Sequence, residues 1–183
     1  MNRIEDYHLL KNRIVKWIKD YADTNNIQAL VVGVSGGIDS AVVSTLCAET
    51  KLPTFPLGMP IHQDHNQESL SDNHLAWLDK KYDNVKPLKF DLTRTFETFK
   101  KTLNEYAKDD LALANTRSRF RMVTLYQIAG KYNGIVVGTG NKVEDYGVGF
   151  YTKYGDGGVD IAPVSYTHLR AHETSLHLVC RLL

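Results

Sequence analysis

The sequence predicts an α/β fold in which a doubly wound parallel sheet carries helices on both faces. The prediction rests on two observations. Short apolar segments alternate four times with longer segments whose apolar residues recur every three or four positions, a pattern typical of parallel strands joined by helical crossovers. The short segments are apolar throughout, as in the segment QALVVGV, so we expect both faces of the sheet to be covered.

The N-terminal half of the chain predicts two strands and the helices around them. Leu10, Ile14 and Ile18 recur at helical spacing with lysines between them, which predicts the first helix. Pro53 and Pro56 confine or shorten any strand in the second extended segment, because proline cannot donate to a strand ladder. In chain order, we expect a helix at 3–23, a strand at 28–34, a helix at 40–50, an extended segment at 53–59 and a helix at 66–82.

The C-terminal half predicts two further strands. Phe96, Phe99 and Leu103 share one face of a predicted helix. The helix before the last strand stops at Asn133-Gly134, a pair typical of a left-handed helix end. In chain order, we expect a strand at 85–92, a helix at 93–107, a helix at about 110–132, a strand at 135–139, and no regular element in the glycine- and tyrosine-rich residues that follow.

Composition and charge narrow the class of protein. Of 183 residues, 43% are hydrophobic and 23% charged, which is typical of a globular domain with its own core. The 22 basic and 21 acidic residues leave a net charge of +1, so no basic block favours nucleic-acid or membrane binding. The N-terminus carries charges throughout, unlike a secretory signal. Two cysteines cannot build a disulfide framework, and we expect a reducing, cytoplasmic setting.

The most informative stretch is GVSGGIDS at residues 33–40, where the first predicted strand enters a helix. Backbone N–H groups in a first helical turn, together with the aligned peptide dipoles, favour phosphate oxygens. Gly36 and Gly37 allow a close approach that a Cβ would block. Ser35 and Ser40 can add hydroxyl donors. The stretch therefore predicts an anion site, the alternative being a glycine turn that only connects strand to helix.

The phosphate loop of Walker type would need the string Gly, four residues, then Gly-Lys-Ser/Thr, and this chain contains no such string. Asp39 stands in the neighbourhood of that lysine instead. An acid beside a polyphosphate is explained if it holds a divalent cation. The simpler alternative is that Asp39 only caps the helix.

The spacing Gly-x-Ser-Gly-Gly-x-Asp-Ser resembles the loop of the N-type ATP pyrophosphatases, which cleave ATP between the α and β phosphates. A second stretch, GTGNKVEDYGVGFYTKYGDGGVDIAP at 138–163, together with ANTRSRFRM at 114–122, resembles ammonia-dependent NAD synthetase. The resemblance covers residues 1 to about 164. It implies a Rossmann-like fold of the adenine nucleotide α-hydrolase type. It also implies a ligase that joins ammonia to deamido-NAD through an acyl adenylate, consuming ATP with Mg²⁺ and releasing AMP and pyrophosphate.

The resemblance further implies a role for each matched residue. Asp156 would receive ammonium or remove its proton, because only neutral ammonia is nucleophilic. Asp39 and Glu144 would hold magnesium, which stabilises charge on the phosphates. ATP would be bound by Gly33, Val34, Ser35, Gly36, Gly37, Ile38, Asp39, Ser40 and Thr139, the last residue of the fourth strand, and deamido-NAD by Asn115, Arg119, Lys153 and Asp160.

Simpler readings exist for several of these residues. Arg117, Arg119 and Arg121 could be a solvated helix face, although alternate residues do not share one face. Glu144 could be a surface acid, and Asp156 could be only a turn residue in its Gly-Asp-Gly-Gly setting. Other enzymes of the same loop class, such as GMP synthetase, asparagine synthetase and tRNA-thiolating enzymes, are alternatives. The last group should show basic patches or paired cysteines, which this chain lacks.

The chain departs from the family after Val164. The family continues to a lysine that contacts ATP and to further helices, whereas residues 165–183 read SYTHLRAHETSLHLVCRLL. We expect a synthetase domain at 1–164, incomplete at its C-terminus, followed by a non-native tail, with a divergent but genuine C-terminus as the alternative. Without that lysine we expect weak ATP binding and much reduced synthesis, and a non-catalytic nucleotide-binding fragment is the limiting case.

The resemblance also implies partners. Family members are homodimers with active sites near the subunit interface. The short N-terminus leaves no room for a glutaminase domain, so we expect the enzyme to use free ammonia or ammonia made by another protein. Neither nucleic acid nor a membrane is expected as a partner.

Overall fold

The computed structural model describes residues 6–141, 145, 147, 149 and 151–164. The strands are β1 (Ala29–Gly33), β2 (Thr54–Gly58), β3 (Leu88–Lys89) and β4 (Gly134–Val137). The helices are α1 (Tyr7–Thr24), α2 (Ile38–Glu49), α3 (His65–Lys81), α4 (Thr93–Leu103), the short 3₁₀ helix η1 (Asn104–Tyr106) and α5 (Asp110–Lys131). In this part of the chain, no helix is long and apolar enough to cross a bilayer.

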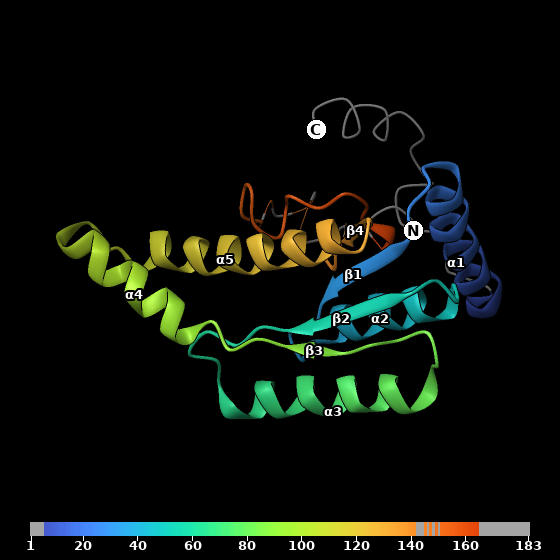
Figure 1. Ribbon diagram of the computed structural model, residues 1–183, viewed down its shortest axis with the longest axis horizontal. Helices are drawn as coiled ribbons and strands as arrows, with labels where there is room; N and C mark the ends of the chain where they lie inside the picture. Colours follow the sequence, from blue (N-terminus) through green and yellow to red (C-terminus); the bar gives the residue numbers. More distant parts are fainter. Residues whose placement is uncertain (1–5, 142–144, 146, 148, 150, 165–183) are drawn as a thin grey trace.

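The four strands form one parallel sheet in the order β3-β2-β1-β4 (Figure 1). Leu30 of β1 pairs with Thr54 of β2 on one side and with Ile135 of β4 on the other. The chain moves outward from β1 through β2 to β3 and then returns past β1 to β4. This reversal creates a topological switch point at the carboxyl ends of β1 and β4, the place where open α/β sheets bind ligands.

Helices cover both faces of the sheet, which confirms the predicted fold class. Leu30 and Val32 point to one face, where they pack with residues of α1 and α2 such as Ile18 and Val43. Val31 points to the other face, into a cluster built largely from β2 and α5. Each fully buried aliphatic side chain of this kind contributes about 1.5–3 kcal/mol to folding. The alternation of β1 between two apolar layers is the reason that its sequence is apolar throughout.

The third strand is much shorter than expected, covering Leu88–Lys89 rather than 85–92. Thr54 N–H donates to Asn84 O and Lys86 N–H donates to Thr54 O, so the even-numbered residues of β2 face β3. The next residue on that side is Pro56, which has no N–H to donate. Pro56 therefore interrupts the β3 ladder, while β2 itself stays continuous and buried over its five residues.

The last helices also differ from the prediction at their ends. The helix expected at 93–107 ends at Leu103 and continues as η1, because Asn104 takes a φ of 51°. Helices α4 and the N-terminal part of α5 project from the sheet as an arm (Figure 1). Phe120 of α5 joins the two helices through ring contacts with Phe96 and Phe99, at centroid distances of 6.0 and 5.2 Å. We call α4, η1 and the α5 segment up to Phe120 the arm.

A short segment near residue 160 adds to the free edge of β4, where no regular element was expected. Ile161 forms a parallel bridge with Val137, and Gly138 N–H donates to Ile161 O over 2.8 Å. This pairing satisfies backbone groups that an exposed edge strand would leave open. It also brings the glycine-rich segment back against the carboxyl end of the sheet.

Candidate functional site

The loop after β1 has a conformation that only glycine allows at its centre. Gly36 has a φ of 90°, in the left-handed region. A Cβ on Gly36 would also collide with the backbone oxygen of Gln67 on α3. The sequence motif therefore encodes both a turn and a close approach between this loop and a neighbouring helix.

Two serine hydroxyls hold the backbone of this loop in place. Ser40 Oγ donates to Gly37 O over 2.9 Å and accepts from Ser35 N–H over 3.2 Å. Ser35 Oγ accepts from Gly37 N–H over 3.2 Å. Ser40 is buried whereas Ser35 is exposed. Ser40 therefore stabilises the loop from the protein interior, and Ser35 is accessible to a ligand.

The first turn of α2 has no side-chain cap, as is also the case for α4 with its N-cap Leu92, whereas α1, α3 and α5 are capped. Asp6, Asp64 and Asp109 cap α1, α3 and α5 through their side chains. Gly37, the N-cap of α2, makes no side-chain cap. Because the first N–H groups of a helix need acceptors from outside it, this end of α2 favours an anion.

Two residues that the sequence did not single out fix the position of the loop. Gln63 Nε2 donates to Ser35 O over 2.9 Å. The buried hydroxyl of Ser71, on α3, donates to Val34 O over 2.9 Å. Gln63 lies in the segment after β2, so its position at the carboxyl edge of the sheet was the one available signal. Nothing in the local pattern of α3 marked Ser71.

The loop after β4 meets the loop after β1 through Asp39. Asn141 Nδ2 donates to Asp39 Oδ2 over 3.3 Å, and both side chains are half-buried. Thr139 does not end the fourth strand as expected, because β4 ends at Val137. The last β1–β4 pair is Val32 with Val137, after which β1 turns into its loop and leaves Thr139 without a strand partner there.

Glu144, the second expected metal ligand, lies outside the described residues. Asp39 is in the first turn of α2, next to the open N–H groups. An acid at this end of a helix is stabilised by the helix dipole. The role of Asp39 as a metal ligand stays a prediction.

Helix α5 holds the glycine-rich segment through the residues expected to bind the dinucleotide. Asn115 Oδ1 accepts from Thr152 Oγ1 over 2.8 Å. Arg119 Nε donates to Lys153 O over 3.0 Å. The structure therefore brings Asn115, Arg119 and Lys153 together, although they come from motifs more than thirty positions apart.

Asp156 is tied into a tight turn within this segment. Its Oδ1 accepts from Ser118 Oγ over 2.7 Å and from Thr152 N–H over 2.9 Å. Its own N–H donates to Ser118 Oγ over 2.9 Å. The turn role considered as the simpler reading is thus present, and it orients an exposed carboxylate. A catalytic role for Asp156 stays a prediction.

Asp160 fastens the end of the segment to the sheet. Its Oδ2 accepts from Val136 N–H over 2.7 Å, and its Oδ1 accepts from Tyr126 Oη over 3.0 Å. Tyr126 Oη is also 2.9 Å from Gly158 O. Burial and the charge of Asp160 raise the pKa of Tyr126 above its usual range, so the phenol stays a donor. Tyr126 is a further residue that sequence reasoning missed, and contact between Asp160 and a substrate stays a prediction.

Comparison with known proteins identifies the family. Residues 10–174 match the family model of NAD synthase. The chain belongs to the NAD synthase family.

Curated NAD synthetases of the ammonia-dependent kind are among the proteins similar to this chain. The NH₃-dependent NAD⁺ synthetase of Mycoplasmopsis pulmonis is 40% identical over 165 residues, which cover 89% of this chain and 60% of the relative. That of Alkaliphilus metalliredigens is 39% identical over 166 residues, covering 84% and 64%. The chain thus spans less than two thirds of the length of these relatives.

Solved structures of an NAD synthetase and of an NMN synthetase share the fold. The NH₃-dependent NAD synthetase of Campylobacter jejuni, solved with nitrate, has a TM-score of 0.77 and 25% identity, covering 97% of this chain and 78% of that one. NMN synthetase from Francisella tularensis has a TM-score of 0.79 and 27% identity, covering 96% and 74%. The predicted family is confirmed, whereas the expected domain boundary at residue 164 stays a prediction.

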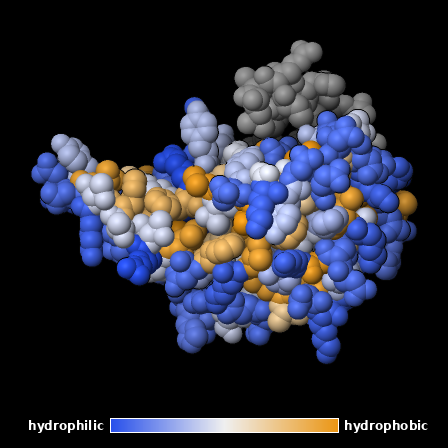
Figure 2. Space-filling view, viewed as in Figure 1, coloured by the Kyte–Doolittle hydropathy of each residue, from blue (hydrophilic) through white to orange (hydrophobic). Residues whose placement is uncertain are grey.

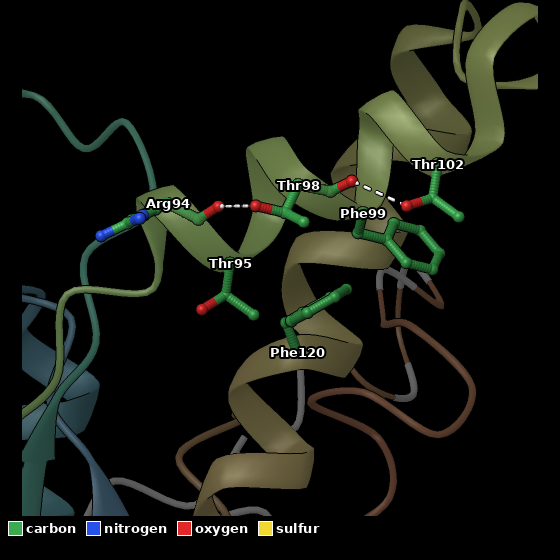
Figure 3. A pocket seen from close by; sticks show the side chains of 6 residues that line it. All are labelled: Arg94, Thr95, Thr98, Phe99, Thr102 and Phe120. Carbon is green, nitrogen blue, oxygen red and sulfur yellow. Dashed lines mark hydrogen bonds between the residues drawn. The ribbon is translucent and has the colours of Figure 1, made fainter.

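Within this NAD synthase fold, the predicted residues that the structure describes form two groups. The loop residues 33–40 lie with Asn141 at the switch point, and α5 gathers the dinucleotide group with the glycine-rich segment. A hollow lined by residues of α4 and by Phe120 of α5 belongs to neither group. Its lining residues are Arg94, Thr95, Thr98, Phe99, Thr102 and Phe120 (Figure 3).

Proposed function

We propose that this chain is the ATP-binding and amide-forming part of an ammonia-dependent NAD synthetase. One observation carries the proposal: an uncapped first turn of α2, with Asp39 in it, lies at the switch point and contacts the loop after β4. Membership of the NAD synthase family and the similarity to ammonia-dependent relatives support it. The reaction would consume ATP, deamido-NAD and ammonia.

ATP would bind with its phosphates on residues 35–40. The serine bridges fix this backbone before ligand binds, so little conformational entropy is lost on binding. Open N–H groups at the start of α2 would donate to phosphate oxygens. Thr139 follows the neighbouring strand and would approach the nucleotide from the β4 side.

The donor set fits magnesium. Mg²⁺ is commonly bound by one or two carboxylates together with phosphates and waters. Among the described residues, which leave out Glu144, no three His, Cys, Asp or Glu side chains form a cluster. Asp39 and Glu144 would hold the ion. When bound, it would neutralise charge on the phosphates and on the leaving pyrophosphate.

The chemistry would run in two displacements. The nicotinate carboxylate of deamido-NAD attacks the α-phosphorus of ATP, a P–O bond forms, and the bond to the bridging oxygen breaks as pyrophosphate leaves. Ammonia then attacks the carbonyl carbon, AMP leaves, and a proton is lost to yield the amide. Asp156 would accept that proton or bind ammonium, since Ser118 and Thr152 already orient its carboxylate.

The dinucleotide would lie along the surface formed by α5 and the glycine-rich segment. Arg119 and Lys153 are exposed and adjacent there, so they present positive charge to a diphosphate. Asn115 and Asp160 complete the proposed contacts. The likeness to NMN synthetase raises a mononucleotide as the alternative substrate. The ammonia-dependent NAD synthetases among the curated relatives favour the dinucleotide.

We further infer that the active form is a homodimer. Apolar surface lies over the arm (Figure 2), and Leu111 and Val123 on α5 are 72% and 71% exposed. A second copy would cover such side chains at a gain of roughly 25 cal/mol per Å² of apolar surface. Light scattering coupled to size exclusion would measure this, and a monomer at high micromolar concentration contradicts it. The cytoplasmic location stays a prediction.

Titration of the folded chain with Mg-ATP tests the proposed function. We expect amide signals of residues 35–40 to shift, and deamido-NAD to trigger release of pyrophosphate from bound ATP. Nicotinic acid mononucleotide in place of deamido-NAD distinguishes the two acceptors. Unmoved amide signals in a chain shown to be folded contradict ATP binding. Pyrophosphate release with the mononucleotide alone reassigns the substrate.

A further inference from the structure

Helix α5 presents arginines to two different environments. Arg119 faces the glycine-rich segment through Lys153 O. Arg117 and Arg121 are four residues apart, so they share another face of the helix. That face turns toward α4 and the end of β2, where Arg121 Nε donates to Met59 O over 3.0 Å. The three arginines are therefore not a single solvated face.

Both arginines of this second face are half-buried. The Arg117 guanidinium carbon lies 5.7 Å from the ring centroid of Phe96. Phe96 is buried in the first turn of α4, at the end of the arm that is nearest the sheet. The i,i+4 spacing on α5 places the two positive charges on one face of the helix, and burial, together with the charge of Arg117, lowers the pKa of Arg121 from its ordinary value. Two like charges that share a half-buried site favour an anion between or beside them.

No carboxylate in the described part of the chain supplies that anion. The ion pairs formed there involve Lys11, Lys16, His62, Lys89 and Lys100, and none involves an arginine. Glu97, on the same helix as Phe96, has Oε1 2.7 Å from His62 Nε2 and 3.3 Å from Lys100 Nζ. A single carbonyl acceptor at Met59 also uses only one of the five N–H donors of Arg121.

The pair lies at the edge of the sheet where the nucleotide is proposed to bind. A Cβ on Gly33, the last residue of β1, would be 3.5 Å from Met59 Cε and 3.7 Å from Leu125 Cδ1. Leu125 is one turn of α5 after Arg121. The C-terminal end of α5 leads into β4, so α5 runs antiparallel to the strands. Arg121, one helical turn before Leu125, therefore lies roughly 6 Å beyond the carboxyl end of β1.

We propose that Arg121, assisted by Arg117, forms a subsite for a phosphate or diphosphate group of a nucleotide bound at this edge. The subsite rests on the proposed function and deepens it, because it adds a cationic wall on the β2 side of the phosphate loop. The planar fork of Arg121, held by the Met59 carbonyl, is preorganised for two phosphate oxygens. Either ATP or deamido-NAD carries such a group, and separate titrations distinguish them.

Three variants and one control test the subsite by calorimetric titration with Mg-ATP and with deamido-NAD. Arg121→Met removes the charge and keeps the apolar stem, Arg121→Lys keeps the charge and loses the fork, and Arg117→Met removes the assisting charge. Arg13→Met, on the exposed side of α1, is the control. We expect Arg121→Met to raise the dissociation constant of one nucleotide about tenfold or more, and Arg121→Lys and Arg117→Met to raise it less. Arg13→Met should leave it unchanged.

A purely structural role gives a different result. If Arg121→Met lowers the melting temperature while both dissociation constants stay at the wild-type value, the subsite is refuted. Where Arg121→Met fails to fold, Arg121→Lys and the NMR signal of Arg121 Nε–H in the wild-type chain decide the matter. That signal should shift with the nucleotide, and an unmoved signal beside shifted loop amides also refutes it.

Inorganic pyrophosphate separates this inference from the proposed function. If Mg-ATP leaves the amides of residues 35–40 unmoved, the proposed function fails first. The Arg121 Nε–H signal must then still respond to millimolar pyrophosphate in the wild-type chain, with a response that falls as salt increases. A signal that does not respond overturns the subsite in that case too.

Discussion

The amide of Asn141 donates to the carboxylate of Asp39 over 3.3 Å and so joins the loops that follow β4 and β1. The two residues are about a hundred positions apart in the chain, and the sheet order alone makes them neighbours. Asn141 thereby orients a half-buried acid in the first turn of α2. This contact therefore involves the proposed metal ligand, Asp39, and the loop proposed to bind phosphate.

Replacing Asp39 tests whether its carboxylate holds magnesium. Asp39→Asn keeps the size of the side chain and removes the charge that would hold magnesium. We expect the affinity for ATP to fall at least tenfold in the presence of Mg²⁺ and to change little in the presence of EDTA. Titration calorimetry under both conditions measures this. An equal loss with and without magnesium would assign Asp39 to the loop structure instead.

Gly36 offers a test of the loop itself. A methyl group there would collide with Gln67 O, and an alanine would have to adopt the φ of 90° that Gly36 has. We expect Gly36→Ala to destabilise the fold by about 2 kcal/mol or more. Urea denaturation measures the change. The matched control is Gly130→Ala in α5, where a Cβ meets no atom within 4 Å, and there we expect a gain of about 0.5–1 kcal/mol. Equal effects at both sites would contradict the close approach.

Much of the fold was predictable because its signals are local. The apolar strands β1 and β4, the spacing of Ile14 and Ile18 in α1, and the glycine-rich turn before α2 are visible in single stretches of sequence. The site motif was equally local, since GVSGGIDS lies within eight consecutive residues. The family and the parallel sheet could therefore be predicted and are confirmed.

The parts that sequence reasoning missed depend on contacts between distant residues. The shortness of β3 follows from which edge of β2 Pro56 faces, and this depends on the register with a strand about thirty residues later. Ser71 and Tyr126 acquire their roles only where their hydroxyls meet Val34 O and the Asp160 carboxylate. No spacing rule places such pairs together.

His74 gives the structure a pH dependence whose direction can be worked out. Its Nε2 is 2.9 Å from the buried Ser44 Oγ, and burial lowers its pKa from the ordinary value of 6.5. Between the lowered folded value and 6.5 the unfolded chain binds more protons, so stability falls as pH falls through this window. We expect His74→Gln to reduce the slope of unfolding free energy between about pH 7 and pH 5.

Urea denaturation at closely spaced pH values measures that slope. His65→Gln is the matched control, since His65 is an exposed histidine in the first turn of the same helix. An unchanged slope in His74→Gln, with the control also unchanged, would mean that His74 titrates in the folded protein as it does in the unfolded chain.

Tyr126 gives a test of how the glycine-rich segment is held. Its hydroxyl lies between Asp160 Oδ1 and Gly158 O, at 3.0 and 2.9 Å. Tyr126→Phe removes only that hydroxyl and should cost about 1–2 kcal/mol, because a hydrogen bond to a carboxylate is lost. We expect faster amide exchange in residues 151–160, while exchange at the start of α2 stays as in the wild type, since the two groups of site residues are anchored separately.

Asp160→Asn should have the larger effect on the same readout. Its carboxylate accepts from Val136 N–H over 2.7 Å as well as from Tyr126, so an amide in its place can present only one acceptor oxygen to two donors. The double variant should then cost less than the sum of the two single ones, because both act on one network. Fully additive effects would show that Tyr126 and Asp160 hold the segment independently, and would leave the bridge of Ile161 to Val137 as its main attachment.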